Sequence, residues 1–406
     1  MNRRLTFTAL TALTAVVTLA LVASAVAKTT AITDPIKLFV IAPVATPIQN
    51  YPDALAGAQA AAAAINKTGG IKGRQIEIGF CNTQSNANVA VACARQAVAE
   101  KATAVVGHIS TLSTLEIPIL AQGNLPSVGM QTSGNTIDWT SPVSFPLVGG
   151  STAAYLTIPS AMKKLGKKRF VIFYQDVPSA ANNAKLARNA ARTAGLPVVG
   201  LIQMAGATTD FAPLAQKLRD LNPDSVMFIN SPGVSGGLMR SATALGVTPL
   251  WSHNSGSIGE PEAAQIGAPA EGMLIGGIFP TFRDTNLAGV KKFVADMTAA
   301  GKSSDEINLK ALGVNGWLSV YAVQAIAKNI KGDVTNTTLL AALRAQKKPL
   351  NLFGLASFAP GAKGPAAYPR WLAQREYFLT FKGGKQVSWG SALPPVVVLR
   401  TLKLIK

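Results

Sequence analysis

The chain has 406 residues, of which 48% are hydrophobic and 14% charged, and its formal net charge is +19. This length allows two domains or one large domain, and the composition supplies enough apolar residues for a large core. The zinc-finger, RNA-recognition and basic-zipper patterns are absent, and aromatic residues make up only 6% of the chain. Basic residues occur in short groups spread along the chain, such as Lys167-Lys168-Arg169, which favours a solvated basic surface. The net positive charge is also compatible with binding to an anionic partner, which is the alternative.

The N-terminus reads as an export signal. Arg3 and Arg4 form a basic head, residues 5–22 carry no charge, and Ala25-Val26-Ala27 is a small-x-small cleavage site. We therefore predict a signal peptide over residues 1–27, cleaved after Ala27, and a periplasmic location. The alternative is a retained membrane anchor, because the uncharged run approaches the ~20 residues that span a bilayer.

The first third of the remaining chain alternates apolar runs with amphipathic stretches. Strands are expected over 36–40, 75–80, 104–106 and 126–128, and helices over 53–66, 87–101 and 112–122. Strands that are apolar on both faces and alternate with helices predict a parallel sheet covered by helices.

The same pattern then restarts. Strands are expected over 169–174, 198–202, 225–229, 250–251 and 273–276, and helices over 153–165, 180–194, 211–221 and 237–245. The repetition predicts an α/β protein with two lobes, each a doubly wound sheet.

The last part of the chain no longer alternates strands and helices regularly. Helices are expected over 309–328 and 337–344, and short strands near 377–381 and 396–399. Glycine-containing segments at about 146–151, 276–281 and 354–364 are predicted to cross between the lobes and to absorb hinge rotation. These crossings assign residues 34–147 plus 280–355 to lobe 1 and residues 148–279 plus 356–406 to lobe 2.

The chain has two cysteines, Cys81 at the end of an expected strand and Cys93 in the helix that follows. An oxidising compartment favours a disulfide between them, and two buried free thiols are the alternative. Neither cysteine has a histidine nearby in sequence, so we predict no metal site and no thiol nucleophile. The sequence indicates no cofactor.

Several segments resemble a known family. The run 36–43, Tyr51 and the stretch 65–74 (INKTGGIKGR) resemble the opening of the branched-chain-amino-acid type of periplasmic solute-binding protein. The segments 105–111 (VVGHIST) and 125–128 (LPSV) resemble its next two signatures. The resemblance implies a type I periplasmic-binding-protein fold with two Rossmann-like lobes and three hinge crossings. It also implies a ligand cleft between the lobes and an ATP-driven permease of the ABC transporter type as partner.

The resemblance also implies site residues in the first lobe. The turn after the third strand grips a ligand carboxylate in this family, which here corresponds to Ser110 and Thr111. A helix N-terminus suits that role because it offers N–H donors and a partial positive charge, although both residues could be plain helix caps. The loop after the fourth strand adds Gln131, Thr132 and Ser133. Tyr51 matches an aromatic wall, or it simply packs on the first helix.

The second lobe departs from the family pattern. The segment Ser252-His253-Asn254-Ser255 lacks the carboxylate that usually pairs the ammonium of an amino-acid ligand. His253 and Asn254 are candidate contacts to amide, hydroxyl or carbonyl groups, although a lone loop histidine is more often structural. Asp176 could be a ligand contact or a helix cap, and Ser231 lies in the loop after the strand over 225–229. Arg283 and His108 are weaker candidates than these.

We therefore predict an extracytoplasmic receptor, not an enzyme, that captures a small polar or carboxylate metabolite by cleft closure and delivers it to an ABC permease. The ligand is expected to be amino-acid-like or an organic or aromatic acid. A monomer that does not bind nucleic acid is expected. A sensory receptor of the same fold that passes ligand state to a signalling partner is the first alternative. An enzyme is less favoured, because no G-x-S-x-G, HExxH or Walker motif occurs.

Overall fold

The computed structural model describes residues 34–46, 49–206, 208–303, 311–372 and 374–403. The chain from Asp34 onward forms one compact unit. The predicted signal peptide lies outside the described residues. None of the helices in the described part is long and apolar enough to cross a membrane.

The first sheet contains five parallel strands in the order β2-β1-β3-β4-β5. Its strands are β1 (Ile36–Ala42), β2 (Ile76–Asn82), β3 (Ala104–Val106), β4 (Ser127–Val128) and β5 (Ser144–Phe145). The helices of this segment are α1 (Pro52–Lys67), α2 (Ala87–Ala99), α3 (Ser113–Gln122) and α4 (Ile137–Thr140). The interior strand β1 is buried along almost its whole length, as expected for a parallel strand covered on both faces.

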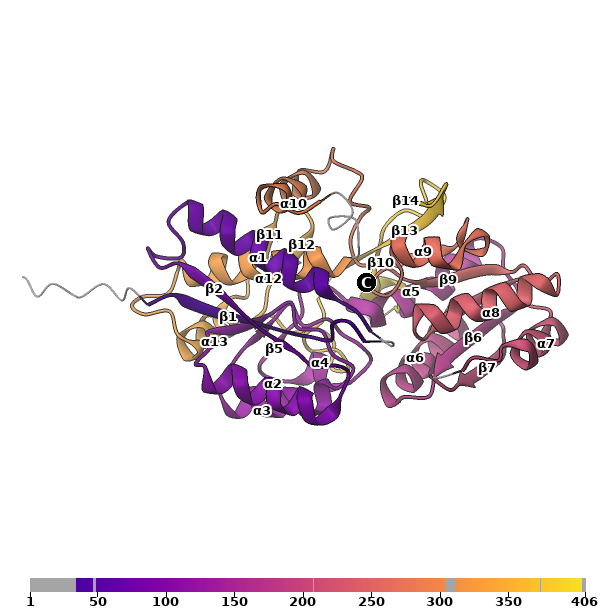
Figure 1. Ribbon diagram of the computed structural model, residues 1–406, viewed down its shortest axis with the longest axis horizontal. Helices are drawn as coiled ribbons and strands as arrows, with labels where there is room; N and C mark the ends of the chain where they lie inside the picture. The colour runs from indigo at the N-terminus through magenta and orange to yellow at the C-terminus, as the bar shows by residue number, and fades with distance from the viewer. Residues whose placement is uncertain (1–33, 47–48, 207, 304–310, 373, 404–406) are drawn as a thin grey trace, which may run out of the picture. The chain divides into compact units, whose positions relative to one another are not determined.

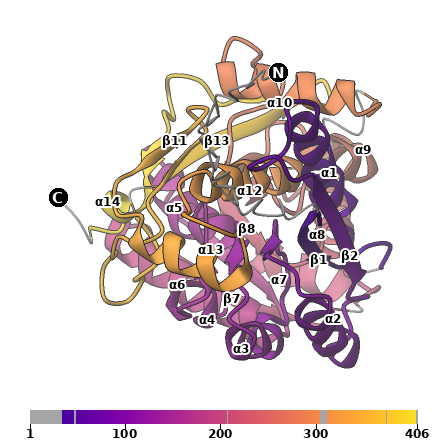
Figure 2. The same ribbon diagram turned by 90° about the vertical axis from the view of Figure 1, so that its left-hand side faces the viewer.

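Later segments return to this first sheet. They are α10 (Ala288–Ala299), α12 (Ala311–Ala327), α13 (Asn336–Ala345) and the antiparallel pair β11 (Leu350–Leu352) and β12 (Ala356–Phe358). Figure 1 shows these orange segments in the same half of the molecule as the indigo α1, β1 and β2, and α12 packs along α1. Figure 2 shows α12 and α13 near each other from another side. One apolar core joins their buried side chains to those of the first sheet.

The second sheet is larger and has the order β14-β13-β10-β9-β8-β6-β7, with β15 also paired to β13. Its strands are β6 (Phe170–Gln175), β7 (Val198–Met204), β8 (Ser225–Ile229), β9 (Leu250–Asn254), β10 (Leu274–Gly277), β13 (Arg375–Lys382), β14 (Lys385–Ser388) and β15 (Val396–Val397). The accompanying helices are α5 (Gly150–Lys164), α6 (Pro178–Ala194), α7 (Ala212–Leu221), α8 (Pro232–Ala244), α9 (Glu260–Ile266) and α14 (Val398–Thr401). Separate apolar clusters fill its two faces.

The prediction of two α/β lobes with helix-covered parallel sheets is confirmed, with one difference. Strands β13, β14 and β15 run antiparallel to their neighbours, so the second sheet is mixed at one edge. A short turn at Gly383-Gly384, both with positive φ, joins β13 to β14 as a hairpin, and a hairpin needs no crossover helix.

Close packing in the first core depends on glycine. A Cβ atom at Gly57 of α1 would collide with the carbonyl oxygen of Gly313 on α12, and one at Gly316 would collide with that of Ala54. The two helices therefore approach nearly backbone to backbone. Asp53 reinforces the contact, because its Oδ2 accepts a hydrogen bond from the Gly313 N–H at 2.9 Å.

A disulfide joins Cys81 on β2 to Cys93 on α2, with a Cα–Cα distance of 5.4 Å. Cys93 is fully buried against the first core. The bond ties the C-terminal end of β2 to the helix that follows it.

The chain passes between the two sheets after β5, after β10 and after β12. The elements on either side follow the order of the predicted lobes. The domain boundaries at residues 147, 279 and 355, and the hinge role of the crossings, remain predictions.

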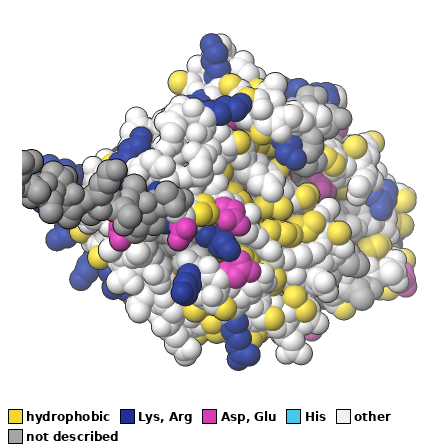
Figure 3. Space-filling view, turned by 60° about the vertical axis from the view of Figure 1, so that its left-hand side comes forward, with side chains coloured by type: hydrophobic (Ala, Val, Ile, Leu, Met, Phe, Trp, Pro, Cys, Tyr) yellow, Lys and Arg dark blue, Asp and Glu magenta, His cyan; other side chains and the backbone are white. Residues whose placement is uncertain are grey.

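The basic surplus is not gathered into one area on the face that Figure 3 shows. Lys and Arg side chains stand apart from one another there, and Asp and Glu side chains lie among them near the centre of the view. This face therefore lacks the continuous basic stripe that is typical of nucleic-acid binding.

Candidate functional site

A cavity of about 220 Å³ lies at the C-terminal ends of strands from both sheets. Its hydroxyl-bearing residues are Tyr51, Ser85, Ser110, Thr111, Ser133, Ser151, Tyr155, Ser179, Ser231 and Ser257. Its amide-bearing residues are Gln49, Gln131, Gln175, Asn183 and Asn230. Its apolar residues are Ile109, Leu112, Val177, Ala180, Ile229 and Pro232. This edge of an open α/β sheet is where ligands generally bind.

The topology explains why these residues meet. The loops after β3 and β4 come from the first sheet, and the ends of β6 and β8 come from the second. In each sheet the parallel strands point their C-terminal ends to the same edge, so residues far apart in sequence share one cavity wall.

Six of the ten predicted site residues line this cavity: Tyr51, Ser110, Thr111, Gln131, Ser133 and Ser231. Ser110 and Gln131 are almost fully buried, and Ser110 Oγ accepts a hydrogen bond from the Leu112 N–H at 2.9 Å. Ser110 is thus also a local cap of the turn that enters α3.

The other four predicted residues lie outside the cavity lining, for different reasons. Asp176 is exposed to solvent. The Thr132 hydroxyl is buried and donates to the Gly149 carbonyl oxygen. His253 and Asn254 are buried near the end of β9, behind residues that do line the cavity.

His253 acts as a support for the backbone. Its Nε2 lies 3.2 Å from the Asn230 carbonyl oxygen, and its Nδ1 accepts from the Asn254 N–H at 2.9 Å. Burial lowers the pKa of His253 to about 4, so the ring is neutral at physiological pH. The weaker candidate Arg283 pairs with Glu260 at 2.6 Å instead of entering the cavity.

Asn254 anchors a second buried group of contacts. Its Nδ2 donates to the Tyr155 hydroxyl at 2.5 Å and to Ser257 Oγ at 3.1 Å. Its Oδ1 accepts from Ser151 Oγ at 3.2 Å. Ser151 in turn lies 3.3 Å from Gln131 Nε2. These bonds run from the loop after β4, through the start of α5, to the end of β9.

Four helices begin at the cavity. Their N-cap residues are Tyr51 (α1), Leu112 (α3), Val177 (α6) and Ser231 (α8), and in none of the four does the side chain of the N-cap residue itself make a capping hydrogen bond. Proline in the first turn of α1, α6 and α8 fixes φ for helix entry. The first-turn N–H groups and the helix dipoles make this wall favourable for negative charge.

None of the described residues that line the cavity has a charged side chain. The wall instead offers hydroxyl and amide groups that can donate or accept hydrogen bonds. A ligand ammonium would therefore have no carboxylate partner in this lining.

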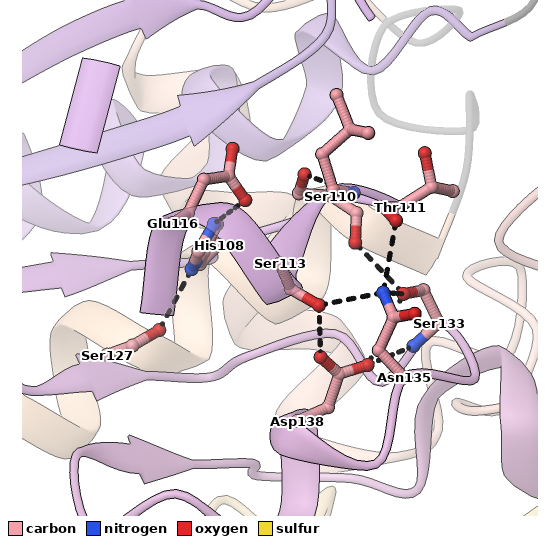
Figure 4. A network of polar contacts seen from close by, with 10 residues as sticks. His108, Ser110, Thr111, Ser113, Glu116, Ser127, Ser133, Asn135 and Asp138 are labelled. Atoms are coloured by element: carbon pink, nitrogen blue, oxygen red, sulfur yellow. Dashed lines mark hydrogen bonds and ion pairs between the residues drawn. The ribbon is translucent and has the colours of Figure 1, made fainter. Parts of the chain in front are cut away.

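A buried polar network stands directly behind the first-sheet wall (Figure 4). Asp138 Oδ2 accepts from the Ser133 N–H at 2.8 Å, and Oδ1 accepts from Ser113 Oγ at 2.5 Å. Asn135 Nδ2 donates to the Thr111 carbonyl oxygen at 3.0 Å and to Ser113 Oγ at 2.9 Å. The Ser133 hydroxyl donates to the Ser110 carbonyl oxygen at 2.9 Å. Together these bonds fix the two loops that present Ser110, Thr111 and Ser133.

His108 and Glu116 form a separate buried pair, which lies to the left of this network in the same view. His108 Nε2 lies 3.1 Å from Glu116 Oε2, and its Nδ1 lies 3.2 Å from Ser127 Oγ. Both side chains are fully buried, and neither lines the cavity. This arrangement gives His108 a structural role.

Helix α6 bridges the two halves of the site. Asn182 Nδ2 donates to the Gly134 carbonyl oxygen at 2.5 Å, and Asn183 Nδ2 donates to the Ser133 carbonyl oxygen at 2.8 Å. The helix belongs to the second sheet and the acceptors to the loop after β4, so these bonds connect the two sides beside the cavity.

Sequence reasoning missed several lining residues. Gln175 ends β6 and Asn230 follows β8, so the rule that ligands lie beyond strand ends could have found both. Ser151 and Tyr155 come from α5, and no local signal in the sequence marks them as lining residues. Among the described residues, no group of three or more His, Cys, Asp or Glu is placed to hold a metal ion.

Comparison with known proteins places the chain among proteins that bind solutes. A family profile described as "Periplasmic binding protein" matches residues 35–377. The chain is 23% identical over 360 residues to the Leu/Ile/Val/Thr-binding protein of Salmonella typhimurium, covering 83% of this chain and 94% of the relative. It is 24% identical over 256 residues to the Leu/Ile/Val-binding protein of Escherichia coli K12, covering 60% of this chain and 68% of that protein.

Solved structures share the fold. A leucine-binding protein from Thermotoga maritima superposes with a TM-score of 0.72 at 19% identity, covering 87% of this chain and 97% of that one. An ABC transporter solute-binding protein from R. palustris in complex with benzoate superposes with a TM-score of 0.73 at 19% identity, covering 89% and 98%. Because the family profile spans most of the chain, and relatives and fold agree with it, the chain belongs to the periplasmic binding protein family and resembles its branched-chain-amino-acid binders.

Proposed function

We propose that this protein is a periplasmic receptor that captures a small carboxylate or neutral polar solute and delivers it to an ABC permease. The observation that carries the proposal is the lining of the cavity, which combines helix N-termini with hydroxyl and amide groups and has no charged side chain. Relatives that bind solutes, and are not enzymes, support a receptor without catalysis.

The ligand class follows from this lining. A carboxylate can accept hydrogen bonds from Ser110, Thr111 and the N-terminus of α3, in a field that favours negative charge. An α-ammonium group would lose water without gaining a carboxylate partner, which is costly in a cavity. An organic acid without an amino group, or a neutral polar solute, therefore fits better than leucine. The benzoate complex of the R. palustris protein supports this choice of ligand class.

Binding is proposed to couple to closure of the two lobes. Walls from both sheets contribute to one cavity, so a ligand makes its full set of contacts only when the walls are close. The hydrogen bonds from Asn182 and Asn183 to the loop after β4 would form when the two lobes close. The permease would then recognise the closed form. Export by the predicted signal peptide and a monomeric state without nucleic acid belong to the same proposal.

Calorimetric titration of the purified protein tests the ligand class. Benzoate, benzamide and leucine would be titrated separately after the protein has been unfolded and refolded to remove carried ligand. We expect benzoate or benzamide to bind at least tenfold more tightly than leucine. Tightest binding of leucine, isoleucine or valine would contradict the proposed class. Mass spectrometry of ligand retained through mild purification would identify the natural solute.

A further inference from the structure

The buried carboxylate of Asp138 lies one side chain behind the cavity wall. It is fully buried on the short helix α4, and Oδ2 lies 3.3 Å from Ser133 Oγ in addition to its 2.8 Å bond from the Ser133 N–H. Figure 4 shows Asp138 aimed at Ser133, with Ser110 and Thr111 beyond it. An anion bound to the Ser133 hydroxyl would lie about 6 Å from this carboxylate, because each hydrogen bond spans about 3 Å.

We propose that Asp138 is a positioning residue that couples ligand binding to proton uptake, so that an anionic solute binds more tightly as the pH falls. The inference rests on the proposed function, because it requires a carboxylate ligand at the Ser110–Ser133 wall. Two negative charges about 6 Å apart repel strongly in a medium of low effective dielectric constant. A proton taken up by Asp138 removes that repulsion.

The Ser133 hydroxyl supports the same direction. Its single hydrogen is within reach of two acceptors, Asp138 Oδ2 at 3.3 Å and the Ser110 carbonyl oxygen at 2.9 Å. An ionised Asp138 competes for that hydrogen with a ligand. A protonated Asp138 keeps one oxygen for the Ser133 N–H and competes less for the hydroxyl.

Asp138 changes its protonation state in a pH range in which ligand binding can be measured. Burial raises the pKa of Asp138 to about 6, and hydrogen bonds from Ser113 and Ser133 limit the rise. An added anion would raise this pKa further. The affinity for an anion should therefore increase as the pH falls through the window that begins above the pKa of the liganded form and ends below about 6.

The other charged groups near α4 are few among the described residues. The buried pair faces it from the loop after β3 (His108) and from α3 (Glu116), and β5 contributes no titratable side chain. Arg370 donates to the Ser141 carbonyl oxygen at 3.2 Å, and Arg344 to that of Pro142 at 3.4 Å. These two cations bind carbonyl groups of the segment that follows α4. Of the charged groups named here, Asp138 is the one whose hydrogen bonds to Ser133 are described.

The test compares wild type with Asp138→Asn, which keeps the shape and removes the titration. Benzoate would be the anionic probe and benzamide the neutral one, titrated by calorimetry at pH 7.5 and 5.5. For wild type we expect the Kd of benzoate to fall about threefold to tenfold between these pH values, within the limit of one proton per ligand. Asp138→Asn should bind benzoate with a nearly constant Kd. The exposed Asp220→Asn variant is the matched control and should keep the wild-type slope.

A second measurement needs no variant. Wild-type titrations near pH 6 in two buffers of different ionisation enthalpy count the protons taken up. We expect net uptake with benzoate and none with benzamide. A pH-independent Kd, zero uptake with benzoate, or an unchanged slope in Asp138→Asn would overturn the coupling and leave the receptor proposal intact. If benzoate and a panel of other small carboxylates fail to bind at either pH, the proposed carboxylate class and the coupling both fail.

Discussion

Asn254 donates a hydrogen bond from Nδ2 to the Tyr155 hydroxyl oxygen across 2.5 Å, and both residues are buried. The bond joins the end of β9 to α5 behind the cavity. Because Asn254 occupies an acceptor position of the Tyr155 oxygen, the phenolic hydrogen remains to donate toward Ser257 or a ligand. Burial raises the pKa of Tyr155 well above its usual value, so the phenol keeps that hydrogen at any physiological pH.

Tyr155→Phe should weaken carboxylate binding. The variant removes one donor from the cavity and leaves the Asn254 amide without its Tyr155 partner. A hydrogen bond to a charged ligand contributes about 1.5–3 kcal/mol, so we expect benzoate to bind roughly 10-fold to 150-fold more weakly by calorimetry. Tyr174→Phe is the control, because the Tyr174 hydroxyl lies only at the 3.5 Å limit from Gln203 on the surface. An unchanged Kd for Tyr155→Phe would exclude a direct or positioning role for the phenol.

Asn183→Ala should weaken binding by a different route. Asn183 lines the cavity and donates to the Ser133 carbonyl oxygen at 2.8 Å, across the two halves of the site. Loss of one neutral hydrogen bond of about 1 kcal/mol in the closed form should raise the Kd about fivefold. Small-angle scattering with saturating ligand should show less compaction than in wild type at the same ligand concentration.

Asn189→Ala provides the comparison for that variant, because Asn189 is exposed on the same helix. It should leave both the Kd and the scattering curve unchanged. Equal losses in the two variants would indicate that α6 itself is destabilised, and the bridging role of Asn183 would be rejected.

The sequence predicted the framework better than the details of the site. Apolar strands alternating with helices required two helix-covered sheets, and parallel strands bring their C-terminal ends to one edge. The loops holding Ser110, Gln131 and Ser231 could therefore be placed at the cavity from sequence. Asp176 and Asn254 were chosen by the same rule, yet one is exposed and the other is buried behind the lining. Side-chain direction within a loop depends on φ and ψ, which strand order does not determine.

Tyr155 and Asp138 could not be recognised as site residues from the sequence, because their positions depend on contacts between distant segments. Tyr155 lines the cavity because α5 packs against β9 and β10, a contact between segments about 100 residues apart. Asp138 lies on a helix of four residues, which is too short to give a periodic pattern. Its role depends on Ser113 and Ser133, and their hydrogen bonds exist only in the folded chain.

Reduction should destabilise the protein. The Cys81–Cys93 bond closes a loop with a sequence separation of 12 residues. Cross-linking a loop of that length stabilises the fold by about 3 kcal/mol in the chain-entropy model. Thermal unfolding with and without dithiothreitol should show a lower midpoint for the reduced protein. The Cys81→Ser/Cys93→Ser variant should resemble the reduced wild type and should not respond to dithiothreitol. If wild type is equally stable in both conditions, the bridge contributes no stability.

His253 should make the fold sensitive to acid. Burial lowers its pKa from 6.5 to about 4, so the unfolded chain binds a proton more readily between these values. The contribution of this neutral histidine is complete above pH 6.5 and is lost as the pH falls toward 4. At pH 4.5 the loss relative to pH 7 should be about 2 kcal/mol. Asp138 acts in the opposite direction, because its raised pKa favours the folded state as the pH falls below about 6.

The His253→Gln variant separates the two effects. A glutamine amide can still donate toward the Asn230 carbonyl oxygen, which lies 3.2 Å from Nε2 in wild type, but it does not titrate. The Asp138 contribution is the same in both proteins and cancels in the comparison. Urea unfolding at pH 7 and pH 4.5 should therefore show a smaller acid-induced fall in the unfolding free energy for the variant, by about 2 kcal/mol. Equal falls would mean that His253 is protonated in the folded state, and that the hydrogen bonds of its ring differ from those described.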